Sequence, residues 1–117
     1  MEITDDYMKK KLETARGYTT VLLKKGPAYE PPNARSPEKS KLVWEHGRRN
    51  MQLQSAGKKA LVGPVMGGGE LVGLSVFNTD AEEARALMDA DVAVRAGIFI
   101  YEIVTWFEFP GDGLPKD

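Results

Sequence analysis

The sequence predicts an α+β fold in which the elements follow the order strand, helix, strand, strand, helix, strand. Residues 18–25 and 98–107 are rich in β-branched and aromatic side chains, which favours strands near both ends of the domain. Residues 37–56 and 81–89 instead carry apolar side chains at helical spacings. A glycine-rich turn at 67–69 separates two further strand-like segments. This order is that of the ferredoxin-like βαββαβ arrangement, a four-stranded antiparallel sheet with two helices on one face.

The N-terminal part of the chain adds a short helix and a long loop to this pattern. Residues 1–17 form a polar helical appendage that ends at Gly17, with only a thin apolar edge. After the first strand, residues 26–37 contain four prolines and show no periodicity, so they form a loop of the length that is often functional. Ser36 precedes Pro37, which places proline at a favourable first position of the first long helix.

The middle of the chain reads as a helix end followed by a hairpin. Gly57 is expected to end the helix because glycine readily adopts the left-handed conformation. Residues 59–66 and 70–78 are predicted to pair as antiparallel strands across the glycine-rich turn. Thr79 and Glu82 have the spacing of a capping box, which predicts the start of the second long helix.

The length of the chain predicts one domain spanning residues 1–117. Within it, residues 92–97 are expected to be a connector that leads into the last strand, and residues 108–117 a flexible tail. The net charge of -1 disfavours nucleic-acid binding, and no apolar run is long enough to predict a membrane span. The chain contains no cysteine, and its acidic N-terminus lacks the apolar core of a signal peptide. We therefore expect a cytoplasmic protein.

Both faces of the last strand are apolar, and this predicts a homodimer. In residues 98–107 the two alternating sets of side chains are both mostly apolar, with Glu102 and Thr105 as the exceptions. Two helices cover only one face of a sheet, so the other face would be a large exposed apolar patch. Packing of two copies through their sheet faces would cover it. The N-terminal helix and the proline-rich loop are the alternative cover.

The helix that follows Pro37 has polar residues in its expected buried stripe. Helical geometry puts residues 42, 46, 49 and 53 on one face, so His46 and Arg49 share a stripe with two leucines. His46 is the only histidine, and histidine can accept and donate protons near neutral pH. It is a candidate acid–base group, although a histidine that simply packs in the core is the alternative. One histidine without cysteines and without carboxylate ligand spacing predicts no metal site.

Several short features, in this order, resemble the YCII-related (YciI-like) domains of the dimeric α/β-barrel superfamily. The resemblance spans about residues 18–107. The matching features are Glu45-His46 on a helix ending in Ala56-Gly57, then Gly63-Pro64, the strand 71–77, the acidic helix start at 80–84, Asp91 followed by Ala96-Gly97, and the terminal strand 102–106. Two differences are a valine in place of the proline that follows the aspartate, and a longer proline-rich loop.

The resemblance implies a ferredoxin-like dimer with a cleft between sheet and helices. In that cleft a histidine and an aspartate, here His46 and Asp91, are proposed to form an acid–base pair. Relatives in the wider superfamily act on small cyclic or aromatic compounds as isomerases, dehydrochlorinases and metal-free monooxygenases. Asp91 has a local alternative, because aspartate is common as a cap or turn residue between a helix and the next element.

Four further residues are candidates for substrate binding. Arg49 could bind a carboxylate or phenolate, or extend its aliphatic stem past the core edge. Gly63 and Pro64 could let the backbone approach a ligand, although a turn at a strand end explains them equally well. Glu102 interrupts an apolar strand and could face the pocket or form a salt bridge at its rim.

These observations predict a small enzyme that needs neither a metal nor a cofactor and acts on a small organic molecule, with His46 as general acid/base oriented by Asp91. An isomerisation, elimination or hydrolytic step would fit this pair. The first alternative is a non-catalytic homodimer that binds a small ligand or acts as an accessory protein. A second is a structural dimer in which the space around His46 is filled.

Overall fold

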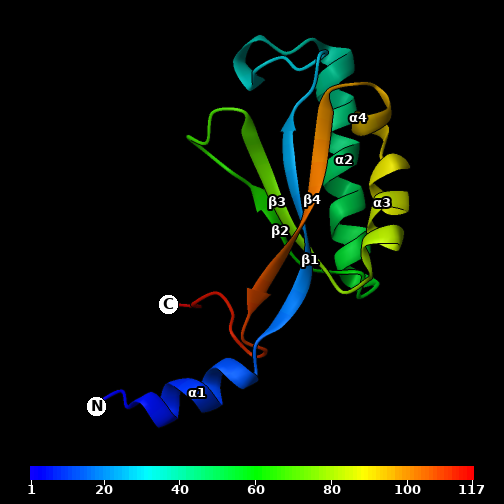
Figure 1. Ribbon diagram of the computed structural model, residues 1–117. Helices are drawn as coiled ribbons and strands as arrows, with labels where there is room; N and C mark the ends of the chain where they lie inside the picture. The colour runs from blue at the N-terminus through cyan, green and yellow to red at the C-terminus, as the bar shows by residue number, and fades with distance from the viewer.

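The chain forms one four-stranded antiparallel sheet with helices packed against one of its faces (Figure 1). The computed structural model describes residues 1–117. Its elements are α1 (Asp5–Glu13), β1 (Arg16–Lys25), a 3-10 turn (Pro32–Ala34), α2 (Pro37–Ser55), β2 (Lys59–Pro64), β3 (Leu71–Phe77), α3 (Ala81–Asp89), α4 (Val92–Arg95) and β4 (Phe99–Glu108).

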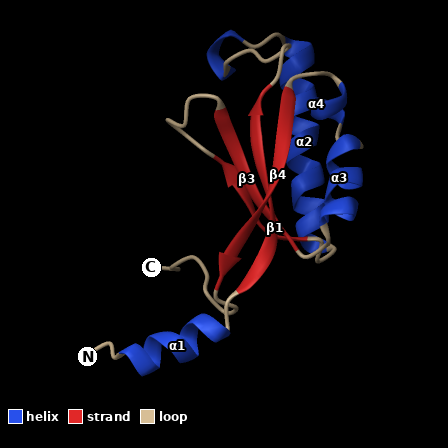
Figure 2. Ribbon diagram, in the orientation of Figure 1, coloured by secondary structure: helices blue, strands red, loops and turns tan.

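The order of strands in the sheet is β2-β3-β1-β4, and every neighbouring pair is antiparallel. Together with the order of elements along the chain, this confirms the predicted ferredoxin-like fold class. Figure 2 shows that α2, α3 and α4 all lie on one side of the sheet, while the other side carries no helix. We call these the helix face and the open face of the sheet. No helix is long and apolar enough to cross a membrane.

Local signals set both ends of α2, the helix that carries His46. The Ser36 side chain accepts a hydrogen bond from the backbone N–H of Lys39 at 3.3 Å, and Pro37 occupies the first helical position. Both features stabilise a helix start, because the first backbone N–H groups have no partner within the helix. Gly57 follows the helix with a φ of 77°, the left-handed conformation expected for the terminator.

The second helical region differs from the prediction in two respects. The residue that caps α3 is Asp80, whose side chain accepts from the backbone N–H of Glu83 at 2.8 Å, so the expected capping box starting at Thr79 is wrong by one residue. Residues 92–95, expected to lie in a connector, form the short helix α4. Asp91 caps α4 by accepting hydrogen bonds from two backbone N–H groups.

A bulge in β2 changes which of its side chains face the helices. Leu61 and Val62 pair with Val76 and Ser75 in regular register, but Lys59 pairs with Phe77, which leaves one extra residue, Ala60, in β2. Such a bulge reverses the alternation of side chains along a strand. Lys59 and Val62, three residues apart, therefore both face the helices.

The core lies between the helix face and α2–α4. Its buried apolar residues are Val21, Leu23, Phe77, Ala84, Met88, Ala93, Ile98 and Phe99. On the open face, by contrast, four large apolar side chains are between 37% and 49% exposed: Leu74, Ile100, Val104 and Trp106.

The N-terminal helix does not cover this open face. In Figure 1, α1 projects away from the sheet, and none of its residues is buried. The proline-rich loop lies at the opposite end of the molecule from α1, above the top of the sheet in the same view. The apolar side chains of the open face are therefore exposed to solvent in the single chain, as the sequence predicts for a sheet that is apolar on both faces.

Candidate functional site

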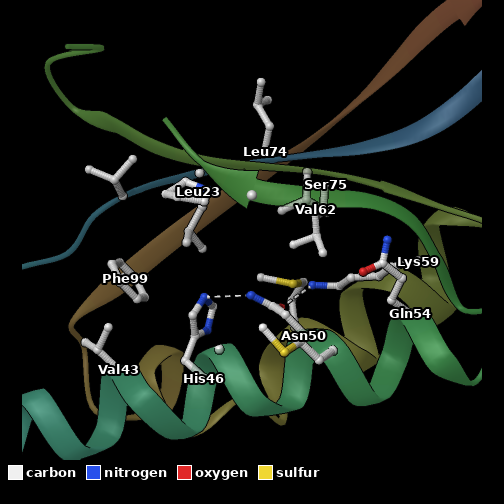
Figure 3. A pocket seen from close by; sticks show the side chains of 18 residues that line it. Leu23, Val43, His46, Asn50, Gln54, Lys59, Val62, Leu74, Ser75 and Phe99 are labelled. Atoms are coloured by element: carbon white, nitrogen blue, oxygen red, sulfur yellow. Dashed lines mark hydrogen bonds between the residues drawn. The ribbon is translucent and has the colours of Figure 1, made fainter. Parts of the chain in front are cut away.

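A cavity of about 360 Å³ lies between α2 and the helix face of the sheet (Figure 3). From α2 it is lined by Val43, His46, Gly47, Asn50, Met51 and Gln54, and from the strands mainly by Val21, Leu23, Lys59, Val62, Ser75 and Phe99. Its lining is largely apolar, with a few polar groups that converge from two sides. This combination is typical of sites for small molecules. The space around His46 is not filled, so the predicted alternative of a purely structural dimer without a pocket is wrong.

His46 contacts Asp91 beside this cavity. The distance between His46 Nδ1 and Asp91 Oδ2 is 2.9 Å, and the two side chains are 10% and 2% exposed. The imidazole also packs against the ring of Phe99, with a centroid distance of 4.9 Å. The two residues are 45 positions apart in the sequence, and the fold brings them together as the resemblance implies.

Asp91 is held as a carboxylate by several donors at once. Besides His46, its Oδ2 accepts hydrogen bonds from the backbone N–H groups of Ala93 at 3.0 Å and Val94 at 3.2 Å. Burial opposes the ionisation of this carboxyl, but the hydrogen bond and charge of His46 and the two N–H groups outweigh it. The pKa of Asp91 is therefore lowered from its ordinary value of 3.8.

Asn50 links the histidine to a lysine on the other side of the cavity. Its Nδ2 lies 3.3 Å from His46 Nε2, and its Oδ1 accepts a hydrogen bond from Lys59 Nζ at 2.7 Å. Because an ammonium only donates, Asn50 must turn its oxygen to Lys59 and its NH₂ group to His46. His46 Nε2 is then an acceptor, and the ring hydrogen sits on Nδ1, where it is donated to Asp91. This is the neutral tautomer that a general base requires.

Lys59 is the most unusual ionisable group of the cavity. It is only 3% exposed, and its Nζ lies 4.9 Å from the centroid of the Phe77 ring. Burial lowers the pKa of Lys59 from 10.5 to about 8. The charge of Asp91 opposes this shift, while the charge of Arg49 adds to it.

The remaining candidates differ in their relation to the cavity. Gly63 and Pro64 border it. Arg49 does not line it, because its Nη1 donates to the backbone oxygen of Leu87 at 2.7 Å and lies 4.0 Å from Asp91 Oδ1. Glu102 pairs with Lys24 on the open face, so it lies on the side of the sheet away from the cavity.

Sequence reasoning missed four polar residues that line the cavity: Asn50, Gln54, Lys59 and Ser75. Two of them, Asn50 and Lys59, connect to His46 by hydrogen bonds. Asn50 follows His46 by four residues on the same helix, a spacing that places two side chains one above the other. That spacing was a usable signal. Lys59 offered none, because regular alternation would place it on the same face as Leu61, and only the bulge at Ala60 turns it toward the helices.

No group of three or more histidine, cysteine, aspartate or glutamate side chains is arranged to hold a metal ion. The polar side chains that line the cavity are those of His46, Asn50, Gln54, Lys59 and Ser75, and the rest of its wall is mainly apolar. Asp91 does not line the cavity but contacts His46. A base oriented by a carboxylate on one side and an ammonium on the other can remove a proton from a small molecule bound between them.

Of three comparisons with known proteins, two find no match and the third finds a similar solved structure. No family profile matches the chain, and no curated protein sequence is similar to it. Among solved structures, it is similar to 5-chloro-2-hydroxyhydroquinone dehydrochlorinase (TftG) from Burkholderia phenoliruptrix AC1100, in complex with 2,5-dihydroxybenzoquinone, with 14% sequence identity and a TM-score of 0.49. The match covers 75% of this chain and 92% of that protein. Similarity at this level transfers neither residues nor a substrate.

Proposed function

We propose that this protein is a small acid–base enzyme that uses His46 and Asp91 on a small organic substrate held in the cavity beside α2. The observation that carries the proposal is the 2.9 Å contact between the two buried side chains next to a cavity of about 360 Å³. Asp91 orients the imidazole and stabilises its charged form after it accepts a proton at Nε2. The protonated Nε2 then returns the proton to another atom of the substrate or to a leaving group.

The reaction class that fits best is an isomerisation or elimination that needs one proton removed and one delivered. A single acid–base group within a mainly apolar wall is suited to moving a proton along a small substrate, because the same nitrogen takes and gives it. The mainly apolar wall favours a compact substrate with an apolar body, such as a cyclic or aromatic compound. In this proposal Gly63 and Pro64 border the bound substrate.

The proposed enzyme is a homodimer of the YCII-related type. The exposed apolar side chains of the open face support the dimer, since a second copy packed there would remove them from water. The meeting of His46 and Asp91 supports the family, since the resemblance implies this pair.

The test is turnover of a panel of small cyclic and aromatic acids, lactones and phenols by the wild type, His46→Gln and Asp91→Asn. We expect at least one compound to be converted, with kcat falling by about 10²-fold or more in His46→Gln, the usual contribution of a positioned acid–base group. The kcat of Asp91→Asn should also fall, because a neutral amide cannot stabilise the protonated imidazole as the carboxylate does. A substrate turned over equally well by His46→Gln would contradict the proposal.

A non-catalytic ligand-binding protein is the second candidate, and one observation favours it. The Asn50 amide already occupies the lone pair of His46 Nε2, at 3.3 Å. If His46→Ala abolished the binding of a compound that the wild type binds but never converts, the binding role would be the better description.

A further inference from the structure

Lys59 is a buried cation without an anionic side chain as its direct partner. The lysines that form ion pairs in this chain are Lys10, Lys24, Lys39 and Lys58, and Lys59 is absent from that set. Its hydrogen-bond partner is the neutral oxygen of Asn50. An ammonium carries three N–H donors, so Lys59 can donate to further acceptors while it keeps its bond to Asn50.

The nearby charges do not neutralise Lys59 directly. Asp91 is the negative group that acts on it, but the carboxylate oxygen Oδ2 already accepts from His46 and two backbone N–H groups. Arg49 adds a second positive charge, with its Nη1 4.0 Å from Asp91 Oδ1. Two cations therefore share one carboxylate, and this region of the protein has an excess of positive charge when His46 is neutral.

The backbone of β2 is distorted in a way that directs Lys59 inward. The extra residue at Ala60 puts Lys59 opposite Phe77, on the helix face, rather than on the exposed face that regular alternation would give it. Bulges of this kind occur often beside active sites, where they reorient a side chain. A lysine on the open face would keep its full hydration at no cost, so the inward position favours a role in the cavity.

We infer that Lys59 binds the negatively charged oxygen of the ligand, so that the cavity takes a small organic acid: a carboxylate or phenolate on a compact apolar body. This inference rests on the proposed function and specifies its substrate class. The ligand oxygen accepts from Lys59 Nζ, and its apolar body lies against Leu23, Val62 and Phe99. Figure 3 shows these apolar side chains between the sheet and α2, on the same side of the sheet as Lys59.

The connection through Asn50 places such an anion close to the base. Lys59 Nζ and His46 Nε2 are bound to the two ends of one amide group, by contacts of 2.7 Å and 3.3 Å. A ligand whose oxygen lies at Lys59 therefore has its neighbouring ring or chain atoms near Nε2. In this arrangement Lys59 also stabilises negative charge that develops on that oxygen when His46 removes a proton from a nearby carbon.

The test compares benzoate with benzamide, a neutral compound of nearly the same shape. Binding is followed by calorimetry in the wild type, Lys59→Met and Lys59→Arg, and by NMR of the Lys59 side chain in the wild type. Lys58→Met is the matched control, since Lys58 is the preceding residue and forms an exposed ion pair with Glu83.

We expect the wild type to bind benzoate at least about tenfold more tightly than benzamide, and Lys59→Met to lose that preference. Lys59→Arg should keep part of it, while Lys58→Met should keep all of it. In the wild type, benzoate should also raise the pKa of Lys59, because a bound anion favours the charged ammonium. This last measurement requires no variant to fold.

The inference is overturned if benzamide binds the wild type as well as benzoate does, if neither binds at millimolar concentration, or if Lys59→Met keeps the preference. Failure of the proposed enzymatic function would give a different result. Benzoate would still bind through Lys59, but no compound of the panel would be converted in a step that depends on His46.

Discussion

The two faces of the sheet depart from the usual distribution of polar and apolar residues in opposite ways. On the helix face, which is buried, the polar side chains of Lys59 and Ser75 are only 3% and 5% exposed. On the open face, apolar side chains such as Ile100 and Trp106 are 49% and 46% exposed. Buried polar groups and exposed apolar patches are the informative exceptions in a globular protein. Here they occur on the two sides of one sheet.

The two departures have different physical consequences. Groups such as His46, Asp91 and Lys59 lose hydration when they are buried, so each must be paired or must be retained at a cost to stability. Exposed apolar side chains cost little in a single chain but lower the free energy of association with a second surface. Our proposals therefore put ligand chemistry on the helix side of the sheet and association on its open face. The following predictions test this division.

The largest expected effect is on the helix side of the sheet, at Asp91, which caps α4. Asp91→Ala removes the carboxylate that accepts hydrogen bonds from His46 and from the backbone N–H groups of Ala93 and Val94. We expect the free energy of unfolding to fall by about 3–5 kcal/mol, because buried donors are left without a partner and α4 loses its cap. Chemical denaturation measures this. Asp80→Ala, which removes only the exposed cap of α3, should cost about 1 kcal/mol.

The same carboxylate predicts a pH dependence. Because the pKa of Asp91 is lower in the folded than in the unfolded chain, its stabilising contribution is complete above about pH 4. That contribution is lost as the pH falls below 3.8 and through the folded-state pKa. The stability of Asp91→Asn should change less over this range than that of the wild type. If the stability of the two proteins changed equally with pH, the pKa of Asp91 would not be lowered in the folded chain.

Replacing Lys59 should raise the free energy of unfolding, whereas replacing Asp91 should lower it. The difference between 10.5 and about 8 in the pKa of Lys59 corresponds to a penalty of about 3 kcal/mol at pH values below 8. Lys59→Met should therefore unfold at a higher denaturant concentration than the wild type at pH 6. The wild type should also gain stability as the pH rises from 8 to 10.5, because the unfolded chain then binds the additional proton.

This gain with pH should be absent in Lys59→Met and unchanged in Lys58→Met, whose lysine is exposed. The measurement is the unfolding midpoint at a series of pH values. A Lys59→Met protein that is less stable than the wild type at pH 6 would mean that the ammonium supports the fold rather than the ligand site.

On the open face, Val104→Glu should prevent association. Val104 is 37% exposed in the single chain, so the glutamate keeps its hydration in the monomer but would be buried between two copies. We expect the dissociation constant of the dimer to rise at least about tenfold, or 1.4 kcal/mol, as measured by sedimentation. Trp44→Glu on the outer side of α2, where Trp44 is 70% exposed, should leave association unchanged. A wild type that sediments at 12.9 kDa at micromolar concentration would disprove the dimer.

The smallest expected effect is that of Arg49→Met. This change removes the hydrogen bond to the backbone oxygen of Leu87, so we expect a loss of about 1 kcal/mol in stability. Because Arg49 does not line the cavity, the affinity for benzoate should stay within about twofold of the wild type. A larger loss of affinity would restore Arg49 to the substrate-binding role considered from the sequence.

Much of the fold follows from local sequence signals, and the exceptions have physical reasons. The strands, both long helices and the end of α2 at Gly57 are predicted because spacing, caps and glycine act over a few residues. Helix α4 is missed because Val92 and Val94 are β-branched and favour extended backbone. Asp91 and packing against α2 and β4 overcome that preference.

The site is predicted in part. His46 is identified from its position in a helical stripe, and Asp91 only through the resemblance, since nothing in the spacing relates residues 45 positions apart. Arg49 satisfies a backbone oxygen instead of facing the cavity, and Glu102 lies on the other side of the sheet in an ion pair with Lys24. Both placements depend on how elements pack, so patterns within one element do not reveal them.

By itself, the sequence determined the order of the elements, the helix on which the histidine lies and the apolar character of both sheet faces. These are properties of short segments, in which side-chain spacing and backbone preference act locally. The tertiary structure decided that Asp91 contacts His46, that Asn50 joins His46 to Lys59, and that a bulge turns Lys59 into the cavity. Each of these depends on contacts between distant segments, where a shift of one residue in a strand moves a side chain to the other face.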